Sequence, residues 1–338
     1  MALIDKFGRV HKYLRISLTE SCNLRCTYCM PEETVFKKEA NYLSPGEIEK
    51  YLDVFVNELG ISKIRLTGGE PTLRSDFSEI LAAFAPYKGK IQMGITTNGV
   101  LLSKYLPKLV ENGFSLVNIS MDTLDRDKFP LISNRNALYW DRAKTGFDLS
   151  RELLLAGEIK KLKINTVVMN RMNSDEICDF VLLTQNLDIE VRFIELMPFA
   201  GNSYSDKLFL AKSDILDIIE KRFGKIDSSP DLTSSSSVGG NLYRIPSFVG
   251  SFGIISSMTD SFCGSCDRLR LTSTGSLRNC LFSNDDTEKK LSGKDRIEMK
   301  ELIKESVEEK FASYGGKKGP ADLHAQSSKT RPMIQIGG

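Results

Sequence analysis

The sequence is poor in several residue types and patterns, and each shortage excludes a class of protein. Its 338 residues include two histidines and one tryptophan, so zinc sites of mixed cysteine and histidine ligands are hard to assemble. No run of 18 apolar residues occurs, and we expect no membrane partner. The 46 basic and 44 acidic residues nearly balance, to a net charge of +2. We therefore expect no nucleic-acid partner, and an anionic ligand must meet a local cluster of Arg and Lys.

The first twelve residues lack the apolar segment of a secretory signal. They carry four basic or imidazole side chains against one acidic residue, Asp5. That composition leaves a transit peptide as the less favoured alternative. We expect a cytoplasmic protein, or a protein of the mitochondrial matrix if the source is eukaryotic.

The seven cysteines carry more information than the overall composition. Six of them form two groups of three, and the seventh stands alone: Cys22, Cys26 and Cys29; Cys263, Cys266 and Cys280; and Cys178. An odd number in tight groups does not suit a disulfide framework. The grouping indicates metal binding in a reducing compartment.

Residues 13–200 alternate between short β-rich runs and longer amphipathic stretches. The pattern predicts six strands, at residues 14–18, 63–66, 92–96, 116–120, 163–168 and 191–195. Helices are expected between them, among them 44–59 with Ser44 as N-cap and Pro45 in the first turn. We predict an α/β protein whose core is a partial (β/α)6 barrel, similar to a TIM barrel.

Polar and glycine-containing motifs follow the predicted strands. Thr19-Glu20-Ser21-Cys22 follows the first, Thr67-Gly68-Gly69-Glu70-Pro71 the second, and Thr96-Thr97-Asn98-Gly99 the third. Because parallel barrels keep their functional residues at the carboxyl ends of the strands, these motifs predict one shared site.

The chain is expected to divide into a barrel at residues 1–225 and a C-terminal extension at 226–338, which carries the second cysteine group. Residues 228–240 are rich in Ser and Gly and predict a linker or loop. Residues 242–258 look strand-like, 296–311 form a charged helix, and the segment from residue 314 is expected to be a flexible tail ending in Gly337-Gly338.

The first cysteine group places three thiolates on one loop after a strand. Thiolates suit iron–sulfur clusters or zinc, and a cubane cluster normally takes four cysteines. Three cysteines would leave one iron open for a non-protein ligand. A zinc site completed by a distant residue, or three unmodified thiols, are the alternatives.

The phrase Cys22-Asn-Leu-Arg-Cys26-Thr-Tyr-Cys29 resembles the signature of the radical S-adenosylmethionine (SAM) superfamily. The resemblance implies a [4Fe-4S] cluster whose open iron holds SAM, and a methionine-binding motif at Gly68-Gly69-Glu70. By the same resemblance, the SAM pocket would be formed by Tyr28, Gly69, Glu70, Asn98, Ser120 and Met197.

The second group, Cys263-x2-Cys266 with Cys280, is followed by Arg268-Leu-Arg270. Alternate residues of a strand share a face, so the two arginines could grip a phosphate beside a metal. A zinc ribbon with a borrowed ligand, and a solvated strand face, are the alternatives.

Together these motifs resemble the GTP 3′,8-cyclase branch of the superfamily, which acts in molybdenum-cofactor synthesis. The resemblance implies a second [4Fe-4S] cluster, a catalytic role for Gly337 and Gly338, an external electron donor and a downstream cyclic pyranopterin monophosphate synthase. A homodimer is a further expectation. The implied GTP contacts are Arg15, Lys63, Arg65, Thr96, Lys163, Arg192, Arg268 and Arg270.

Two features depart from the branch. Asp267 stands where Asn is frequent, and residues 129–140 do not follow the usual pattern. The rival hypotheses are a peptide-modifying radical SAM enzyme with an auxiliary cluster and, outside enzymes, a metal-binding interaction module.

Overall fold

The computed structural model describes residues 2–31, 33–202, 204–228, 242–325 and 331–337. In this part of the chain, twelve strands form one sheet in the order β14-β13-β12-β3-β4-β5-β6-β7-β8-β11-β10-β9. Its central strands are β3 (Tyr13–Ser17), β4 (Lys63–Thr67), β5 (Gln92–Thr97), β6 (Phe114–Ser120), β7 (Lys161–Val168) and β8 (Ile189–Glu195). All neighbouring pairs among these six are parallel. The predicted six-strand core is confirmed.

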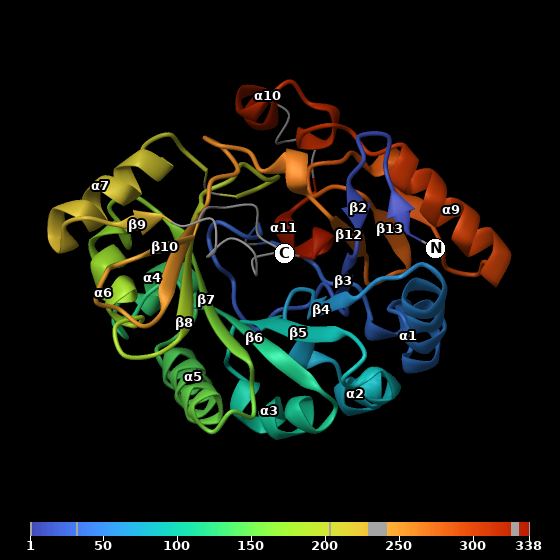
Figure 1. The fold of residues 1–338 in the computed structure, drawn as a ribbon, viewed down its shortest axis with the longest axis horizontal. Helices are drawn as coiled ribbons and strands as arrows, with labels where there is room; N and C mark the ends of the chain where they lie inside the picture. The colour runs from blue at the N-terminus through green and yellow to red at the C-terminus, as the bar shows by residue number, and fades with distance from the viewer. Residues whose placement is uncertain (1, 32, 203, 229–241, 326–330, 338) are drawn as a thin grey trace.

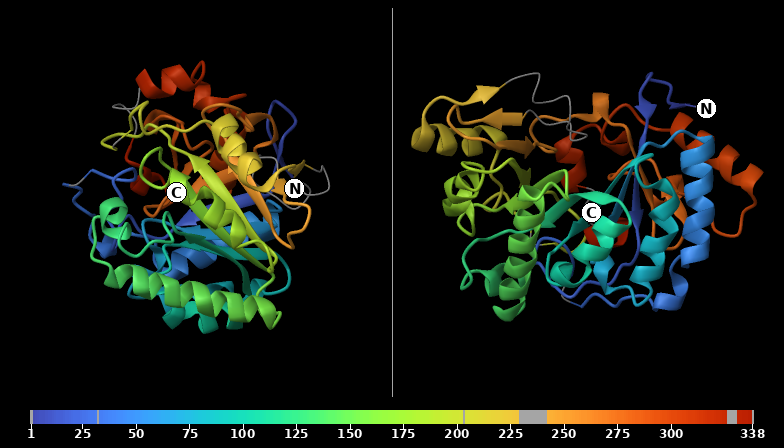
Figure 2. Two further views of the ribbon diagram at one scale, coloured as in Figure 1. Left: turned by 90° about the vertical axis from the view of Figure 1, so that its left-hand side faces the viewer. Right: turned by 60° about the horizontal axis from the view of Figure 1, so that its bottom comes forward.

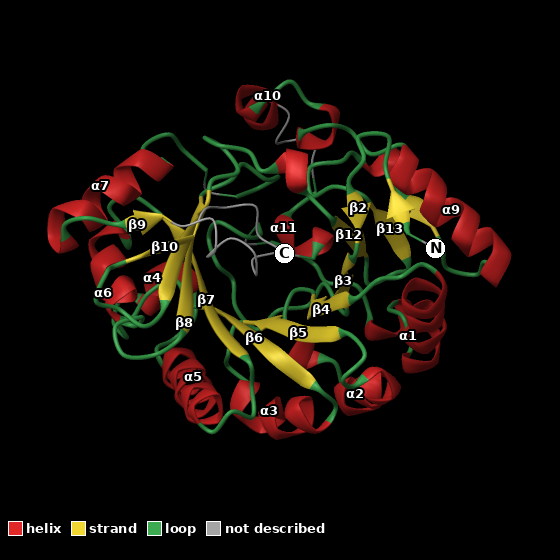
Figure 3. Cartoon of the chain, viewed as in Figure 1, coloured by secondary structure: helices red, strands yellow, loops and turns green. Residues whose placement is uncertain are grey.

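Helices cover the outside of the curved sheet, and the strands form the inner ring (Figure 1, Figure 3). The helices that connect the six strands or follow the last of them are α1 (Pro45–Leu52), α2 (Phe77–Phe84), α3 (Leu102–Glu111), α4 (Phe129–Ser133), α5 (Leu138–Leu155), α6 (Ile177–Leu182) and α7 (Lys212–Phe223). Strand residues such as Leu14, Ile64 and Ile95 are fully buried in the main core. Burial of this apolar layer holds the ring together.

The first helix begins where the sequence predicts. The Ser44 hydroxyl accepts a hydrogen bond from the Glu47 amide, and the Glu47 carboxylate accepts one from the Ser44 amide. This reciprocal cap satisfies two amides at the helix start. After α1 the helix continues as a π-helical stretch, Asp53–Glu58.

Residues beyond 225 extend the sheet at both edges. On one side lie β9 (Asp227–Ser228), β10 (Leu242–Arg244) and β11 (Ser251–Ile255); on the other lie β12 (Arg268–Leu271), β13 (Ser276–Arg278) and β14 (Lys289–Lys290). Strand β11 pairs parallel to β8, and β12 pairs parallel to β3. The strand-like pattern expected at 242–258 is confirmed as two strands, since β10 turns back antiparallel onto β11. The loop predicted at 228–240 lies outside the described residues except for Ser228.

The C-terminal segment is ordered by packing. The charged helix is confirmed as α9 (Arg296–Glu308), and α10 (Pro320–Ala325) and α11 (Met333–Ile336) follow it. Ile334 and Ile336 are 2% and 1% exposed. Helix α11 lies inside the ring of strands in Figure 1, and Figure 2 shows the same fold from two further sides. Apolar side chains thus anchor the described residues of this segment, and the flexible tail predicted from residue 314 stays a prediction.

At the other end of the chain, β1 (Leu3–Ile4) and β2 (Val10–His11) form an antiparallel hairpin. Asp5, Arg9 and His11 are buried in it. None of the helices among the described residues is both long and apolar enough to cross a membrane.

Candidate functional site

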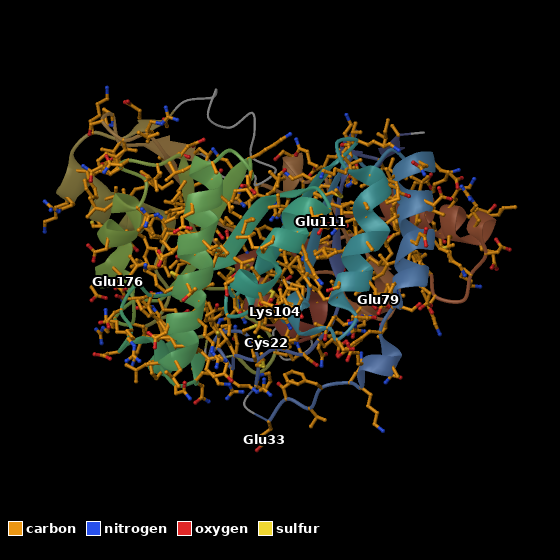
Figure 4. The ribbon with its side chains drawn as sticks, turned by 90° about the horizontal axis from the view of Figure 1, so that it is seen from below. Cys22, Glu33, Glu79, Lys104, Glu111 and Glu176 are labelled. Atoms are coloured by element: carbon orange, nitrogen blue, oxygen red, sulfur yellow. The ribbon has the colours of Figure 1, made fainter. Side chains whose placement is uncertain are left out.

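One cavity opens at the carboxyl ends of the central strands. In Figure 4, Cys22 lies toward the end of the barrel where α3 begins, near Lys104, and away from Glu111, where α3 ends. Fifteen of the residues that line the cavity belong to the strand-end motifs or their neighbours: Tyr13, Arg15, Cys22, Cys26, Tyr28, Cys29, Arg65, Gly69, Thr96, Asn98, Ser120, Arg192, Met197, Arg268 and Arg270. The predicted rim is thus assembled from strands far apart in sequence.

The first cysteine loop lies directly over the rim. The Asn98 side-chain amide donates to Cys22 Sγ at 3.7 Å, and the Leu24 backbone amide does so at 3.4 Å. The Tyr28 hydroxyl donates to Asp122 Oδ2 at 2.7 Å and ties the loop to the end of β6. Burial raises the pKa of the Cys22 and Cys29 thiols to about 12. Thiols in such surroundings ionise only when a cation compensates them, which fits a metal cluster.

Glu70 is placed differently from the other predicted SAM residues. It is fully buried and does not line the cavity. Its Oε1 accepts from the Thr97 hydroxyl at 2.8 Å, and its Oε2 accepts from the Asn98 amide at 2.7 Å. The carboxylate therefore joins the loop after β4, which carries Gly69, to the loop after β5, which carries Asn98.

Glycine is required at position 69, in the loop after β4. A Cβ atom at Gly69 would lie 2.3 Å from the Ser21 carbonyl oxygen. Residue 69 must therefore lack a side chain for the two rim loops to touch. The contact leaves the Gly68-Gly69 backbone facing the cavity beside the cysteines.

The inner wall of the barrel is strongly electropositive. The Arg65 Nε donates to the Tyr13 hydroxyl at 2.8 Å. Burial alone would raise the pKa of Tyr13, but Arg65, Arg15 and further cations outweigh it and lower that pKa to about 7. A cavity wall with this potential is suited to a polyanion.

Lys163 and Arg192 extend this wall but share one counter-ion. Both bind Glu190, at 2.6 and 2.5 Å, and all three are buried. Burial, then the charge of Arg192, lowers the pKa of Lys163 to about 7. Arg192 lines the cavity, whereas Lys163 and Lys63 are not among its lining residues.

Some polar groups in the cavity lack protein partners. The Thr96 hydroxyl and the Oδ1 atoms of Asn118 and Asn165 are buried and have no hydrogen-bond partner among the described residues. Unsatisfied buried groups are costly, so their position indicates a polar ligand. Sequence analysis missed both asparagines, although Asn118 lies two residues before Ser120 and hence on the same strand face.

The second cysteine group surrounds a smaller adjoining cavity. Cys263 begins a short turn, and Cys266 precedes β12. Cys280 lies two residues beyond the end of β13, the strand in which Arg278 pairs with Arg270. Arg268 and Arg270 line both cavities, so the predicted arginines stand between the two cysteine groups.

A buried carboxylate holds the chain segment that leads to the second cysteine group. Glu195, at the end of β8, is fully buried and accepts hydrogen bonds from the amides of Met258 and Thr259. Its other oxygen accepts from the Lys212 amide at 3.0 Å. These bonds fix the segment that leads from β11 to Cys263.

The C-terminal segment reaches the arginines. Arg270 Nη1 donates to the Gly337 carbonyl at 2.5 Å. Gly337 has φ +78°, and a Cβ atom there would lie 2.9 Å from Ser17 Cβ. Gly338, also predicted to be functional, lies outside the described residues.

The two cysteine triads do not form a ligand set for a single metal ion among the described residues. Within the described ranges, no three His, Cys, Asp or Glu side chains converge closely enough to hold one metal ion. A tetrahedral zinc site needs four such ligands within about 2.3 Å of the metal. Two sets of three cysteines, each lining one cavity, fit groups that bring their own sulfide, such as iron–sulfur clusters.

Comparison with known families agrees with this geometry. Residues 16–184 match the Radical SAM superfamily profile, and residues 189–315 match the Molybdenum Cofactor Synthesis C profile. A GTP 3′,8-cyclase of Thermodesulfovibrio yellowstonii is 38% identical, over 99% of both chains. The chain belongs to the GTP 3′,8-cyclase family of the radical SAM superfamily. The mitochondrial GTP 3′,8-cyclase of Arabidopsis thaliana is 42% identical, over 99% of this chain and 83% of that protein.

Other members of the family are longer. Molybdenum cofactor biosynthesis protein 1 of Dictyostelium discoideum is 43% identical, and this chain spans 52% of its length. Among solved structures, SuiB of Streptococcus suis bound to S-adenosylmethionine has a TM-score of 0.60 at 18% identity, covering 86% of this chain and 66% of that one. This likeness concerns the fold alone, and it confirms the predicted fold class.

Proposed function

We propose that this chain is a radical SAM enzyme that converts GTP to 3′,8-cyclo-7,8-dihydro-GTP in molybdenum-cofactor synthesis. The observation that carries the proposal is the pair of arginines, Arg268 and Arg270, which line both the cavity beside the first cysteine triad and the smaller cavity beside the second. Relatives named GTP 3′,8-cyclase, matched over most of their length, support the same reaction. The family supports SAM and one iron–sulfur cluster.

Each cysteine triad has a proposed role. Cys22, Cys26 and Cys29 hold the [4Fe-4S] cluster that binds SAM. When SAM is bound and the cluster is reduced, the two together would supply a primary carbon radical that can remove a hydrogen atom. Cys263, Cys266 and Cys280 hold a second [4Fe-4S] cluster at the base end of GTP.

The chain's own residues position the two ligands. Tyr28, Gly69, Asn98, Ser120 and Met197 line the SAM side of the cavity, and Glu70 joins the loop that carries Gly69 to the loop that carries Asn98. The predicted GTP contacts surround the triphosphate and ribose. They are Arg15, Lys63, Arg65, Thr96, Lys163, Arg192, Arg268 and Arg270.

Loss of the 3′ hydrogen from GTP lets C3′ bond to C8 of guanine, and one electron and one proton complete the product. Buried walls and the C-terminal segment keep water and other targets from the radical. Arg270 holds Gly337 at this site, and we propose that Gly337 and Gly338 take part in catalysis.

The wider setting is proposed on the family's chemistry. An external donor reduces the cluster, and a cyclic pyranopterin monophosphate synthase consumes the product. The enzyme acts in the cytoplasm, or in the mitochondrial matrix in a eukaryote, and a homodimer is the proposed assembly. The division of the chain at residues 225 and 226 stays a prediction.

Anaerobic reconstitution tests the function. With iron and sulfide, the proposal requires about eight irons per chain, and a brown rather than colourless protein. Dithionite, SAM and GTP should then yield 5′-deoxyadenosine and a cyclised GTP by mass spectrometry. Two clusters with 5′-deoxyadenosine and unaltered GTP would instead favour a peptide substrate, and bound zinc would contradict the proposal.

A further inference from the structure

A buried lysine contacts the second cysteine group. Lys310 lies two residues beyond the end of α9 and is 2% exposed. Its Nζ donates to the Arg268 carbonyl at 2.9 Å and to the Cys266 carbonyl at 3.4 Å. The same nitrogen lies 3.6 Å from Cys266 Sγ, within hydrogen-bonding distance for sulfur.

The charge of Lys310 needs a negative partner. A buried ammonium is costly unless it is paired. Within the described part of the chain, Lys310 makes no ion pair with a carboxylate, and its acceptors are two carbonyls and a cysteine sulfur. The anion best placed to pair with it is therefore the thiolate of Cys266.

The N-terminal hairpin fixes this contact. Arg9 Nη1 donates to the Cys263 carbonyl at 2.8 Å and to the Ala312 carbonyl at 2.9 Å, and Nη2 donates to the Phe311 carbonyl at 2.7 Å. Asp5 in turn holds Arg9 at 2.6 Å. One guanidinium thus joins the cysteine turn to the segment that carries Lys310.

The first cysteine group has different surroundings. Its sulfur contacts are neutral amide donors, from Leu24 and Asn98. A buried ammonium therefore contacts a sulfur of the second triad, whereas the amides that donate to Cys22 are neutral. The sequence spacing does not reveal this difference.

We propose that Lys310 donates a charged hydrogen bond to the Cys266 thiolate and thereby raises the reduction potential of the second cluster. Hydrogen bonds to sulfur and nearby positive charge favour the reduced cluster, which carries one more electron. The inference rests on the proposed function, since it requires a cluster at the second triad. Lys310 acts through Cys266 and is a positioning residue.

A variant that holds only the second cluster allows the effect of Lys310 on the reduction potential of that cluster to be measured by itself. Replacing Cys22, Cys26 and Cys29 by Ala leaves only the second triad, and about four irons per chain are expected. In this background Lys310→Met removes the charge at similar length, and Lys310→Arg keeps it. Lys304→Met, the matched control, removes a half-buried charge from helix α9, which precedes Lys310. Iron content and the midpoint potential, from a redox titration followed by electron paramagnetic resonance, are measured for each.

We expect full iron in every variant and a lower midpoint potential in Lys310→Met alone. A wild-type midpoint potential in iron-replete Lys310→Met would overturn the proposal. Loss of iron from both Lys310→Met and Lys310→Arg would overturn it too, because the residue would then be a structural support. If the background chain holds no iron with Lys310 intact, the second cluster of the proposed function fails instead.

Discussion

Arg270 Nη1 and the Gly337 carbonyl oxygen are 2.5 Å apart, although the residues are separated by 67 positions. The contact brings the last described residue of the chain to the strand that carries the arginines. It also places the C-terminal segment at the boundary between the two cysteine groups. Substitutions at Gly337 should therefore affect turnover and leave the cysteine loops intact.

Gly337→Ala should reduce GTP turnover at least about tenfold, because a Cβ atom would meet Ser17 and the positive φ is strained. Iron content should stay at the wild-type value. Gly319→Ala is the matched control, since a Cβ atom there has no neighbour within 4 Å. Wild-type turnover by Gly337→Ala would contradict a role for this residue.

Arg268→Ala should lower GTP-dependent turnover by about 100-fold or more, the usual loss when a donor to a reacting substrate is removed. Some uncoupled 5′-deoxyadenosine should still form, because the SAM side of the cavity is unchanged. Both products are followed by mass spectrometry. Arg142→Ala, at an exposed position, should behave as wild type. Normal cyclisation by Arg268→Ala would remove this arginine from the substrate site.

Glu70→Gln should weaken SAM binding about tenfold, or about 1.4 kcal/mol. Both oxygens of the Glu70 carboxylate accept hydrogen bonds from the rim, and an amide would turn a donor toward one of them. Equilibrium dialysis on reconstituted protein measures the affinity, with exposed Glu111→Gln as control. Unchanged affinity in Glu70→Gln would show that the rim does not depend on this carboxylate.

GTP affinity should fall as pH rises from 6.5 to 8.5. Burial and Arg192 lower the pKa of free Lys163 to about 7, and a bound triphosphate would favour its ammonium form and raise that pKa. Binding is then strongest below pH 7 and weakens by up to about tenfold per pH unit above it. Lys163→Arg should make GTP affinity less dependent on pH, because arginine stays charged. Identical pH profiles for the two proteins would exclude Lys163 from the linkage.

Arg9→Ala should lower the free energy of unfolding by about 3 kcal/mol, because it leaves the buried Asp5 carboxylate without its guanidinium. Urea denaturation of the iron-free chain measures this, and exposed Lys12→Ala should stay within about 0.5 kcal/mol of wild type. A loss no larger than that control would show that the hairpin is dispensable.

The Asp5 carboxylate also predicts that the free energy of unfolding falls at acid pH. Burial acts to raise the pKa of Asp5, but hydrogen bonds from His11 and Arg9 outweigh it and lower that pKa to about 2. The contribution of Asp5 to stability is therefore present above about pH 4 and is lost as pH falls toward 2. Asp5→Asn should lack this part of the acid dependence in urea titrations at successive pH values.

Local periodicity predicted the central strands closely, as with residues 63–66 against β4, Lys63–Thr67. It also predicted that the strand-end motifs would gather at one cavity, because parallel strands bring their carboxyl ends together without further information. The strand ends that carry Thr96 and Ser120 are examples.

Contacts between distant segments could not be predicted in this way. The parallel pairing of β12 with β3 and the burial of Ile336 depend on packing across the barrel. Lys310 stands at the end of a charged helix, where a solvated side chain is the ordinary expectation. Only the folded chain shows that it faces Cys266.

Hydrogen transfer from GTP is the most direct test of the central claim. The reconstituted enzyme would be given GTP labelled with deuterium at C3′, and the 5′-deoxyadenosine would be analysed by mass spectrometry. The account predicts one deuterium in 5′-deoxyadenosine and a cyclised GTP without the label at C3′. Unlabelled 5′-deoxyadenosine beside intact GTP would contradict it.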